Sequence, residues 1–340
     1  MDVDGTEKMT ISSKTCDLSI VVIAYNEAAT LPACLESVRT ADLDGIFYEL
    51  IYVDGGSSDS SVAEAQSAGV DRLLTSDGQC GAAKNRNRGW AAARGRYVQF
   101  VDGDMVLDQD WPRAAMTLLE ERPEVAVVFG RLQERNTNAL YQAMQIDWEY
   151  PEGEAQFCGG AALFRRSVLE TLGGFPEDVG FGEEPYLCWR IRNELSNKIY
   201  HLHRPMANHD LAFKGLRDYW QRNLRCGQAF AEVASRCANA EDPMWSEEVR
   251  ANLAWSAVLL MTLLATVGTA VTLFIGIGVP IVPACLATGP ALLTALLFRK
   301  TLQFVVQGRP VMVALLYALH TYAAKLGIAF GILRWRLLRR

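Results

Sequence analysis

The sequence predicts an α/β domain with a doubly wound, mostly parallel sheet, followed by a C-terminal helical membrane region. Apolar runs alternate with helical patterns through the first 235 residues, several runs end in acidic residues, and acids disappear after residue 250. Strands alternating with helices at this spacing are typical of a parallel sheet covered by helices. The predicted divisions are a polar tail (1–17), the α/β domain (18–235), a connector (236–250) and the membrane region (251–340).

The first predicted strands are apolar runs that stop at polar residues. A run from Leu18 ends at Tyr25, Asn26 and Glu27, and an amphipathic helix follows in "LPACLESV". A second run ends at Asp54, just before a series of glycines and serines. "DRLLTS" reads as a third, short strand.

The following segments repeat this pattern. "GAAKNRNRGWAAARG" has helical composition, and the strand after it ends at Asp102-Gly103-Asp104. "VAVVFGRLQ" is predicted to be a further strand. Ligands of open α/β sheets bind outside the carboxyl ends of the strands. The polar strand ends at residues 25–27, 54 and 102–104 are therefore expected to face one crevice.

Asp102 and Asp104 indicate a divalent cation site. Two carboxylates one residue apart repel each other, and a hard cation such as Mg²⁺ or Mn²⁺ takes such oxygens as ligands together with substrate phosphates. Gly103 has no side chain, which leaves room for a ligand to approach closely. Lys84, Arg86 and Arg88 lie just upstream, where one of them could contact a diphosphate or each could simply be a solvated cation.

With these residues in place, the sequence resembles the inverting family 2 glycosyltransferases of GT-A fold. The resemblance covers roughly residues 18–231 and implies a metal-dependent transfer of a hexose from a nucleotide diphosphate sugar. Five blocks in this order carry it: "SIVVIAYNE", "LIYVDGGSSD", "RNRGWAAARGRYVQFVDGD", "GGAALFRR" and "GGFPEDVGFGEEPYLCWRIR".

The resemblance implies donor-side roles position by position. Tyr25 and Glu27 match residues that line the nucleotide pocket, and Asp54 matches the acid that hydrogen-bonds the base. Arg86 matches a position near the diphosphate, and Gly160 belongs to a turn that closes the donor-sugar pocket.

The same resemblance implies which residues hold the metal. Asp102 matches the acid near the ribose and sugar, and Asp104 matches the direct metal ligand. His209 matches a histidine that some relatives use as a further metal or phosphate contact, although a lone polar histidine is often only a surface residue.

Acceptor-side roles fall on the segment around Glu184. Glu184 stands where the family places its catalytic aspartate, and Glu183 is the alternate general base. The family's second aspartate is missing here, and both glutamates could instead be helix-start acids favoured by the dipole. Trp189 and Arg190 are expected to contact substrate.

The charge distribution separates an acidic domain from a basic tail. The net charge is −6, but residues 251–340 hold eight Lys or Arg and no acid, so residues 1–250 carry 25 basic against 39 acidic side chains. This division excludes nucleic acid, which needs a basic surface on the folded domain, and favours a membrane surface as partner.

The tail predicts at least two membrane helices. No charged residue occurs from 251 to 298, a length that suits spans at about 253–275 and 281–298. A third stretch, 311–333, is an interfacial helix or a third span; the arginines after it favour the interface. With no signal-peptide pattern and eight scattered cysteines, the expected location is the cell inner or plasma membrane, multi-pass, with a cytoplasmic domain.

The predicted function is a membrane-anchored transfer of a hexose to a lipid-linked or glycan acceptor. A processive polysaccharide synthase would need membrane helices on both sides of the domain, and nothing apolar precedes residue 18. A sugar-phosphate nucleotidyltransferase would have a glycine-rich loop where "AYNEAATLP" stands. A non-catalytic nucleotide-sugar binding protein remains open, because only Glu183 and Glu184 distinguish it from an enzyme.

Overall fold

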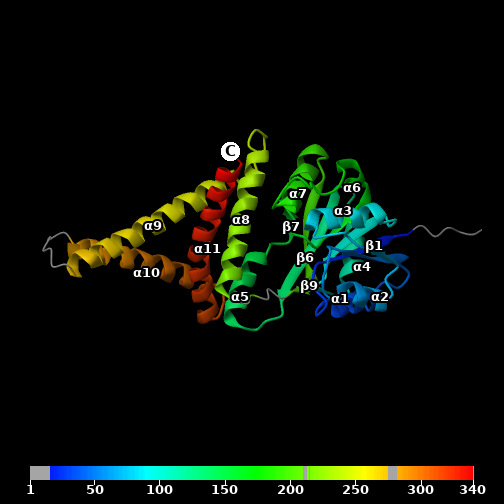
Figure 1. The fold of residues 1–340 in the computed structure, drawn as a ribbon, viewed down its shortest axis with the longest axis horizontal. Helices are drawn as coiled ribbons and strands as arrows, with labels where there is room; N and C mark the ends of the chain where they lie inside the picture. The colour runs from blue at the N-terminus through cyan, green and yellow to red at the C-terminus, as the bar shows by residue number, and fades with distance from the viewer. Residues whose placement is uncertain (1–15, 210–212, 214, 275–281, 340) are drawn as a thin grey trace, which may run out of the picture. The chain divides into compact units, whose positions relative to one another are not determined.

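The computed structural model describes residues 16–209, 213, 215–274 and 282–339 (Figure 1). The chain divides into two compact units. Unit 1 comprises residues 1–128 and 160–174, and unit 2 comprises residues 129–159 and 175–340. The predicted polar tail therefore lies almost wholly outside the described residues.

Unit 1 contains a mostly parallel sheet, which confirms the predicted fold class. Its strands follow the order β3-β2-β1-β4-β8-β6. β1 pairs in parallel with β2 and β4, β2 pairs in parallel with β3, and β8 runs antiparallel to β4 and β6. The strands are β1 (Leu18–Ala24), β2 (Tyr48–Asp54), β3 (Arg72–Leu74), β4 (Tyr97–Asp102), β5 (Val106–Leu107), β6 (Val125–Glu134) and β8 (Leu163–Arg165).

Burial on both faces explains the composition of these strands. All seven residues of β1 are buried, and β2 and β4 are buried over most of their length. Strands covered on both sides read as continuous apolar runs, as these do.

The helices of unit 1 are α1 (Leu31–Arg39), α2 (Ser61–Ser67), α3 (Ala82–Ala92), α4 (Trp111–Glu121) and α6 (Arg166–Leu172).

The register of the strands sets the position of the acidic residues. Ala24 of β1 pairs with Asp54 of β2, and Ile23 pairs with Asp102 of β4. The carboxyl ends of three neighbouring strands therefore lie at one edge of the sheet. This places the polar residues that follow β1 and β4 close together.

Unit 2 holds the remaining strands and a set of long helices. β9 pairs antiparallel with β7 and neighbours β6. In Figure 1, α9 and α10 run away from α8 as a pair of long helices, whereas α11 lies along α8. The elements are α5 (Ala139–Gln145), the 3₁₀ helix η1 (Ile146–Trp148), β7 (Gly153–Ala155), α7 (Glu183–Glu194), β9 (Lys198–His209), α8 (Leu216–Arg236), α9 (Ser246–Phe274), α10 (Val282–Val306) and α11 (Val311–Leu338).

Glycines let α8 and α11 cross at close range. A Cβ on Gly227 of α8 would lie 2.0 Å from the carbonyl oxygen of Ile328, and a Cβ on Gly331 of α11 would lie 2.2 Å from that of Leu224. Small residues at helix crossings allow this approach of two backbones. The close packing of α11 on α8 therefore depends on the absence of a side chain at Gly227 and Gly331.

A polar network explains the histidine in the apolar helix α11. His320 is buried, and its ring nitrogens lie 2.9 Å from Asp147 Oδ2 and 2.8 Å from the hydroxyl of Tyr219. Tyr317 donates a further hydrogen bond to Asp147 at 2.9 Å. Contact with His320 and Tyr317 helps hold the pKa of Asp147 below its usual range, against the opposing effect of burial. His320 thus has polar partners inside unit 2.

Within the described residues, two helices are long and apolar enough to cross a membrane. They are residues 246–268 of α9 and residues 311–338, which make up α11. The first overlaps the predicted span 253–275. The predicted span 281–298 begins outside the described residues, and whether α11 spans the membrane or lies at its surface stays a prediction.

We expect Gly227→Ala to destabilise unit 2 by about 1–3 kcal/mol, because the new methyl group would overlap the Ile328 carbonyl. The matched change Gly268→Ala has open space around its Cβ and should be neutral or stabilise by up to about 1 kcal/mol. Thermal unfolding of the detergent-solubilised chain measures both. Equal melting temperatures for the two variants would contradict the close crossing.

Candidate active site

A pocket of about 250 Å³ opens at the carboxyl ends of β1 and β4 in unit 1. It is the crevice expected from the polar strand ends. Its lining residues are Ile23, Ala24, Tyr25, Glu27, Cys80, Ala82, Asn85, Arg86, Asp102 and Asp104.

Three carboxylates meet in this pocket. Glu27 follows β1, and Asp102 and Asp104 stand at the end of β4. Burial, followed by the charges of Asp104, Asp102 and Asp59, raises the pKa of Glu27 to about 8. Glu27 Oε2 is buried and has no hydrogen-bond partner among the described residues. The sequence predicted Glu27 as a nucleotide contact in the same crevice as the two aspartates, but it did not predict Glu27 as a member of the cation site.

These residues fit a hard divalent cation. Clustered carboxylate oxygens, one of them buried without a donor, are the ligands that Mg²⁺ and Mn²⁺ take. Gly103 is part of the fit, since a Cβ at that position would lie 2.4 Å from Glu27 Oε2. A cation at Glu27, Asp102 and Asp104 would relieve the repulsion that raises the pKa of Glu27.

Arg86 is the basic residue of the pocket. It is only 4% exposed, and its Nη2 donates to Asp102 Oδ1 at 2.9 Å. A Cβ on Gly160 would lie 2.4 Å from Arg86 Nη2, so the glycine leaves room for the guanidinium. Of the other two basic residues considered, Lys84 is exposed and Arg88 donates to Thr75 and Ser76. Arg86 is therefore placed to orient Asp102 as well as to meet an anion.

The N-terminus of α3 also opens on the pocket. Ala82, in the first turn of α3, and Asn85 line it, together with Cys80 just before the helix. Free backbone N–H groups at a helix start favour anions such as phosphate. The sequence did not point to these three residues, although Gly81 before a helical run is a signal for such a start.

Two predicted nucleotide residues occupy different surroundings. Tyr25 lines the pocket and is 39% exposed. Asp54 is buried and accepts hydrogen bonds from the backbone N–H groups of Gly56 and Ser57, at 2.8 and 2.9 Å. It is not among the lining residues, so in this structure its carboxylate holds the turn after β2. Its contact with a base stays a prediction.

The predicted base Glu184 lies in unit 2, in a buried group with two thiols. Its Oε1 accepts from the backbone N–H of Cys158 at 2.9 Å and lies 3.3 and 3.1 Å from the sulfurs of Cys158 and Cys188. Burial raises its pKa, although these donors oppose the effect. Glu183, the alternate base, precedes it in α7 and is partly exposed.

The remaining predicted residues of unit 2 pair with their neighbours. Trp189 donates from Nε1 to the carbonyl oxygen of Asp242 at 2.8 Å and stacks on Tyr186. Arg190 pairs with Glu194 on the same helix, Nε to Oε1 at 2.8 Å. The ring of His209, at the end of β9, makes a T-shaped contact with the ring of Trp148. The structure explains these positions without a substrate, and their binding roles stay predictions.

Comparison with known proteins matches residues 19–173 to the model of glycosyl transferase family 2. A putative glycosyltransferase, EpsH of Bacillus subtilis, is 26% identical over 62% of this chain and 65% of its own length. The pre-mycofactocin glycosyltransferase of Mycobacterium tuberculosis is 26% identical over 67% of this chain and 50% of its own length. The chain thus spans about half to two thirds of the length of these relatives.

Solved structures show the same fold. The mannosyltransferase PcManGT from Pyrobaculum calidifontis, in complex with GDP-Man and Mn²⁺, aligns with a TM-score of 0.63 and 18% identity, over 95% of this chain and 88% of that one. A TarS fragment of S. aureus in complex with UDP-GlcNAc aligns with a TM-score of 0.51 and 17% identity, over 68% and 69% of the two chains. At these identities the likeness establishes the GT-A-like architecture.

The raised pKa of Glu27 predicts a pH-dependent stability. Its ordinary pKa is 4.5 and its folded value is about 8, so the protonated form is favoured on folding. That contribution is complete below about pH 4.5 and is lost as the pH rises through 8. Glu27→Gln should therefore melt progressively higher than the parent chain between pH 5 and pH 8, measured without divalent cations.

Mn²⁺ at pH 8 should raise the melting temperature of the parent chain and have less effect on Glu27→Gln. Glu36→Gln, an exposed change on α1, serves as the control and should follow the parent chain throughout. Parallel pH curves for the parent chain and Glu27→Gln would show that Glu27 carries no raised pKa.

Proposed function

We propose that the chain, whose residues 19–173 match the model of glycosyl transferase family 2, is a metal-dependent, inverting hexosyltransferase. Its donor would be a nucleotide diphosphate sugar and its acceptor a lipid-linked or glycan hydroxyl or phosphate. Polysaccharide, lipopolysaccharide or polyprenyl-phosphate glycosylation would all use such a reaction. The observation that carries the proposal is the pocket where Glu27, Asp102 and Asp104 face Arg86 and the start of α3.

This pocket combines the two features that a nucleoside diphosphate requires. Its carboxylates can hold a cation, and the α3 start with Arg86 can receive the phosphate oxygens. A bound Mg²⁺ or Mn²⁺ would neutralise charge on the departing diphosphate. The complexes of PcManGT with GDP-Man and Mn²⁺ and of TarS with UDP-GlcNAc support a nucleotide sugar as donor.

The chain's own residues prepare the site before any donor arrives. Arg86 fixes Asp102 through the 2.9 Å ion pair, so one aspartate is already oriented. Gly103 and Gly160 leave the space that Glu27 and Arg86 occupy. Such preorganisation lowers the cost of assembling charged groups around the diphosphate.

Inverting transfer needs a general base for the acceptor, and we assign that role to Glu184, with Glu183 as the alternate. A carboxylate whose pKa is raised by burial is a better proton acceptor near neutral pH than an ordinary glutamate. The N–H of Cys158 fixes one oxygen of Glu184. The partial exposure of Glu183 keeps it accessible to an acceptor.

The helices of unit 2 support a membrane-bound acceptor. α9 and α11 are long and apolar enough to cross a bilayer. Many of their large apolar side chains are exposed, including Met261, Leu264 and Phe330. Anchoring would restrict the search for a lipid-linked acceptor to the membrane plane. The side of the membrane proposed for the α/β domain is the cytoplasmic one.

Asp104→Asn should abolish Mn²⁺-dependent binding of the nucleotide, because the change removes a carboxylate from the cation site. The measurement is the rise in melting temperature with UDP or GDP plus Mn²⁺, which follows RT ln(1 + [L]/Kd). Asp44→Asn, an exposed change in unit 1, should keep the full shift. An unchanged shift for Asp104→Asn, or one unaffected by EDTA, would remove the cation from the proposal.

Glu184→Gln should lower transfer of a radiolabelled sugar by about 10²–10⁴-fold while leaving the nucleotide-dependent melting shift intact. Glu183→Gln, tested in parallel, should have the smaller effect if Glu184 is the base. The reverse ranking would move the role to Glu183. Donor binding without transfer in the parent chain, with lipid-linked and glycan acceptors supplied, would favour a nucleotide-sugar binding protein.

A further inference from the structure

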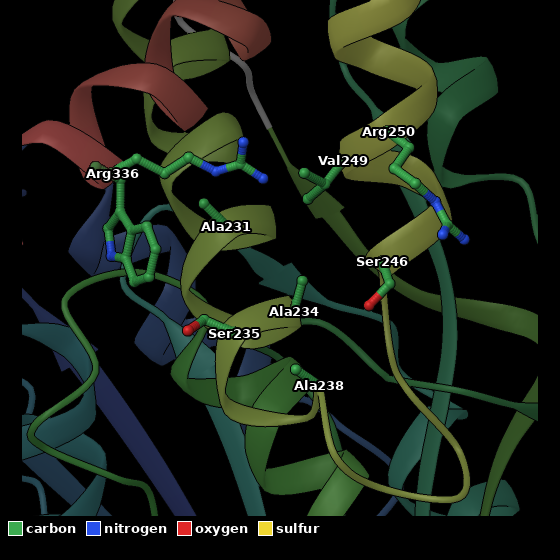
Figure 2. Close-up of a pocket in the computed structure, with 9 residues that line it drawn as sticks. Ala231, Ala234, Ser235, Ala238, Ser246, Val249, Arg250 and Arg336 are labelled. Atoms are coloured by element: carbon green, nitrogen blue, oxygen red, sulfur yellow. The ribbon is translucent and has the colours of Figure 1, made fainter.

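A second pocket lies in unit 2, where α8, the start of α9 and the end of α11 meet (Figure 2). Its volume is about 340 Å³, within the range of small-ligand sites. Its lining combines alanine, valine and tryptophan with two serines and two arginines, so the pocket suits an amphiphilic ligand. Its lining residues are Ala231, Ala234, Ser235, Ala238, Ser246, Val249, Arg250, Trp335 and Arg336.

The charged residues that line this pocket are both arginines. In Figure 2 the side chain of Arg336 reaches over Ala231 of α8, and Arg250 extends from α9, farther from the alanines of α8. A third guanidinium, that of Arg339, lies 4.7 Å from the centre of the Trp335 ring, and its Nη1 contacts the hydroxyl of Ser235 at 3.4 Å. None of the nine described lining residues is acidic.

The nearby acid Glu232 is already engaged. It accepts a hydrogen bond from the indole N–H of Trp335 and pairs with Arg236, Nε to Oε1 at 2.8 Å. Glu247 approaches Arg250 only to 3.7 Å, and both side chains are largely exposed, so their pairing is weak. The arginines of the pocket can therefore take an anionic ligand.

The pocket stands at the ends of both apolar helices. Ser246 begins α9 and the apolar segment 246–268, and Trp335 and Arg336 lie in the last turn of the apolar helix α11. Tryptophan and arginine at the end of an apolar helix are typical of the headgroup level of a bilayer. Beyond the pocket, α9 exposes Trp255, Val258 and Leu260, which acyl chains would cover.

We propose that this pocket binds the phosphate of an anionic glycerophospholipid. Arg336 of α11 and Arg250 of α9 would both contact the phosphate, with the hydroxyl of Ser246 and the N–H groups at the start of α9 as further donors. Acyl chains would continue along the exposed face of α9. The proposal rests on the membrane attachment put forward above but not on sugar transfer.

Native mass spectrometry of the detergent-solubilised full chain tests the site. We expect the parent chain to retain phosphatidylglycerol at lower lipid concentration than phosphatidylcholine. Arg250→Gln/Arg336→Gln should weaken phosphatidylglycerol retention about tenfold. Arg225→Gln/Arg299→Gln removes the same charge from exposed positions outside the pocket and should retain the lipid like the parent chain.

A second variant tests the pocket without changing its charge. Ala238→Trp, at an exposed lining position, should fill the space and also weaken retention. Equal retention by the parent chain and the Arg250/Arg336 variant would overturn the proposal, as would an equal loss in the control pair. Displacement of the lipid by inorganic phosphate at matched concentration would instead identify a site for a free anion. Nucleotide-induced melting shifts, measured on the same samples, report on the donor pocket separately.

Discussion

The mutual repulsion of Glu27, Asp102 and Asp104 is the constraint on which the pocket of unit 1 depends. Three carboxylates at one sheet edge repel each other unless a proton, an arginine or a cation offsets their charge. In this pocket an arginine and a proton do so. Arg86 neutralises Asp102, while the raised pKa of Glu27 shows that a proton takes up part of the remaining charge. A divalent cation would replace that proton, so cation binding and the ionisation of Glu27 would be linked.

The sheet keeps these charges together. Parallel pairing of β1 with β4 brings Ile23 opposite Asp102. Burial of the apolar residues of both strands fixes that register. Shifting one strand by a residue would turn its apolar side chains to the wrong face. The apolar core of unit 1 thus holds the acids in place at the edge of the sheet.

In unit 2, polar groups are packed among apolar helices. His320 and Asp147 form a hydrogen bond with each other. Gly227 and Gly331 allow α11 to approach α8 closely. These contacts leave Arg250 and Arg336 at the helix ends, beside a pocket with apolar walls. Anchoring and lipid recognition would therefore use the same helices.

The sequence by itself determined the α/β class, the strands that lead to Glu27 and Asp102, and the apolar tail, because burial on both strand faces and the loss of charge leave local patterns. Only the tertiary structure decided which charges meet. Nothing local indicates that Arg86 pairs with Asp102 while Arg88 turns to Thr75, or that Glu184 lies beside two thiols. Such contacts join residues far apart in the chain, and strand register and helix packing set them.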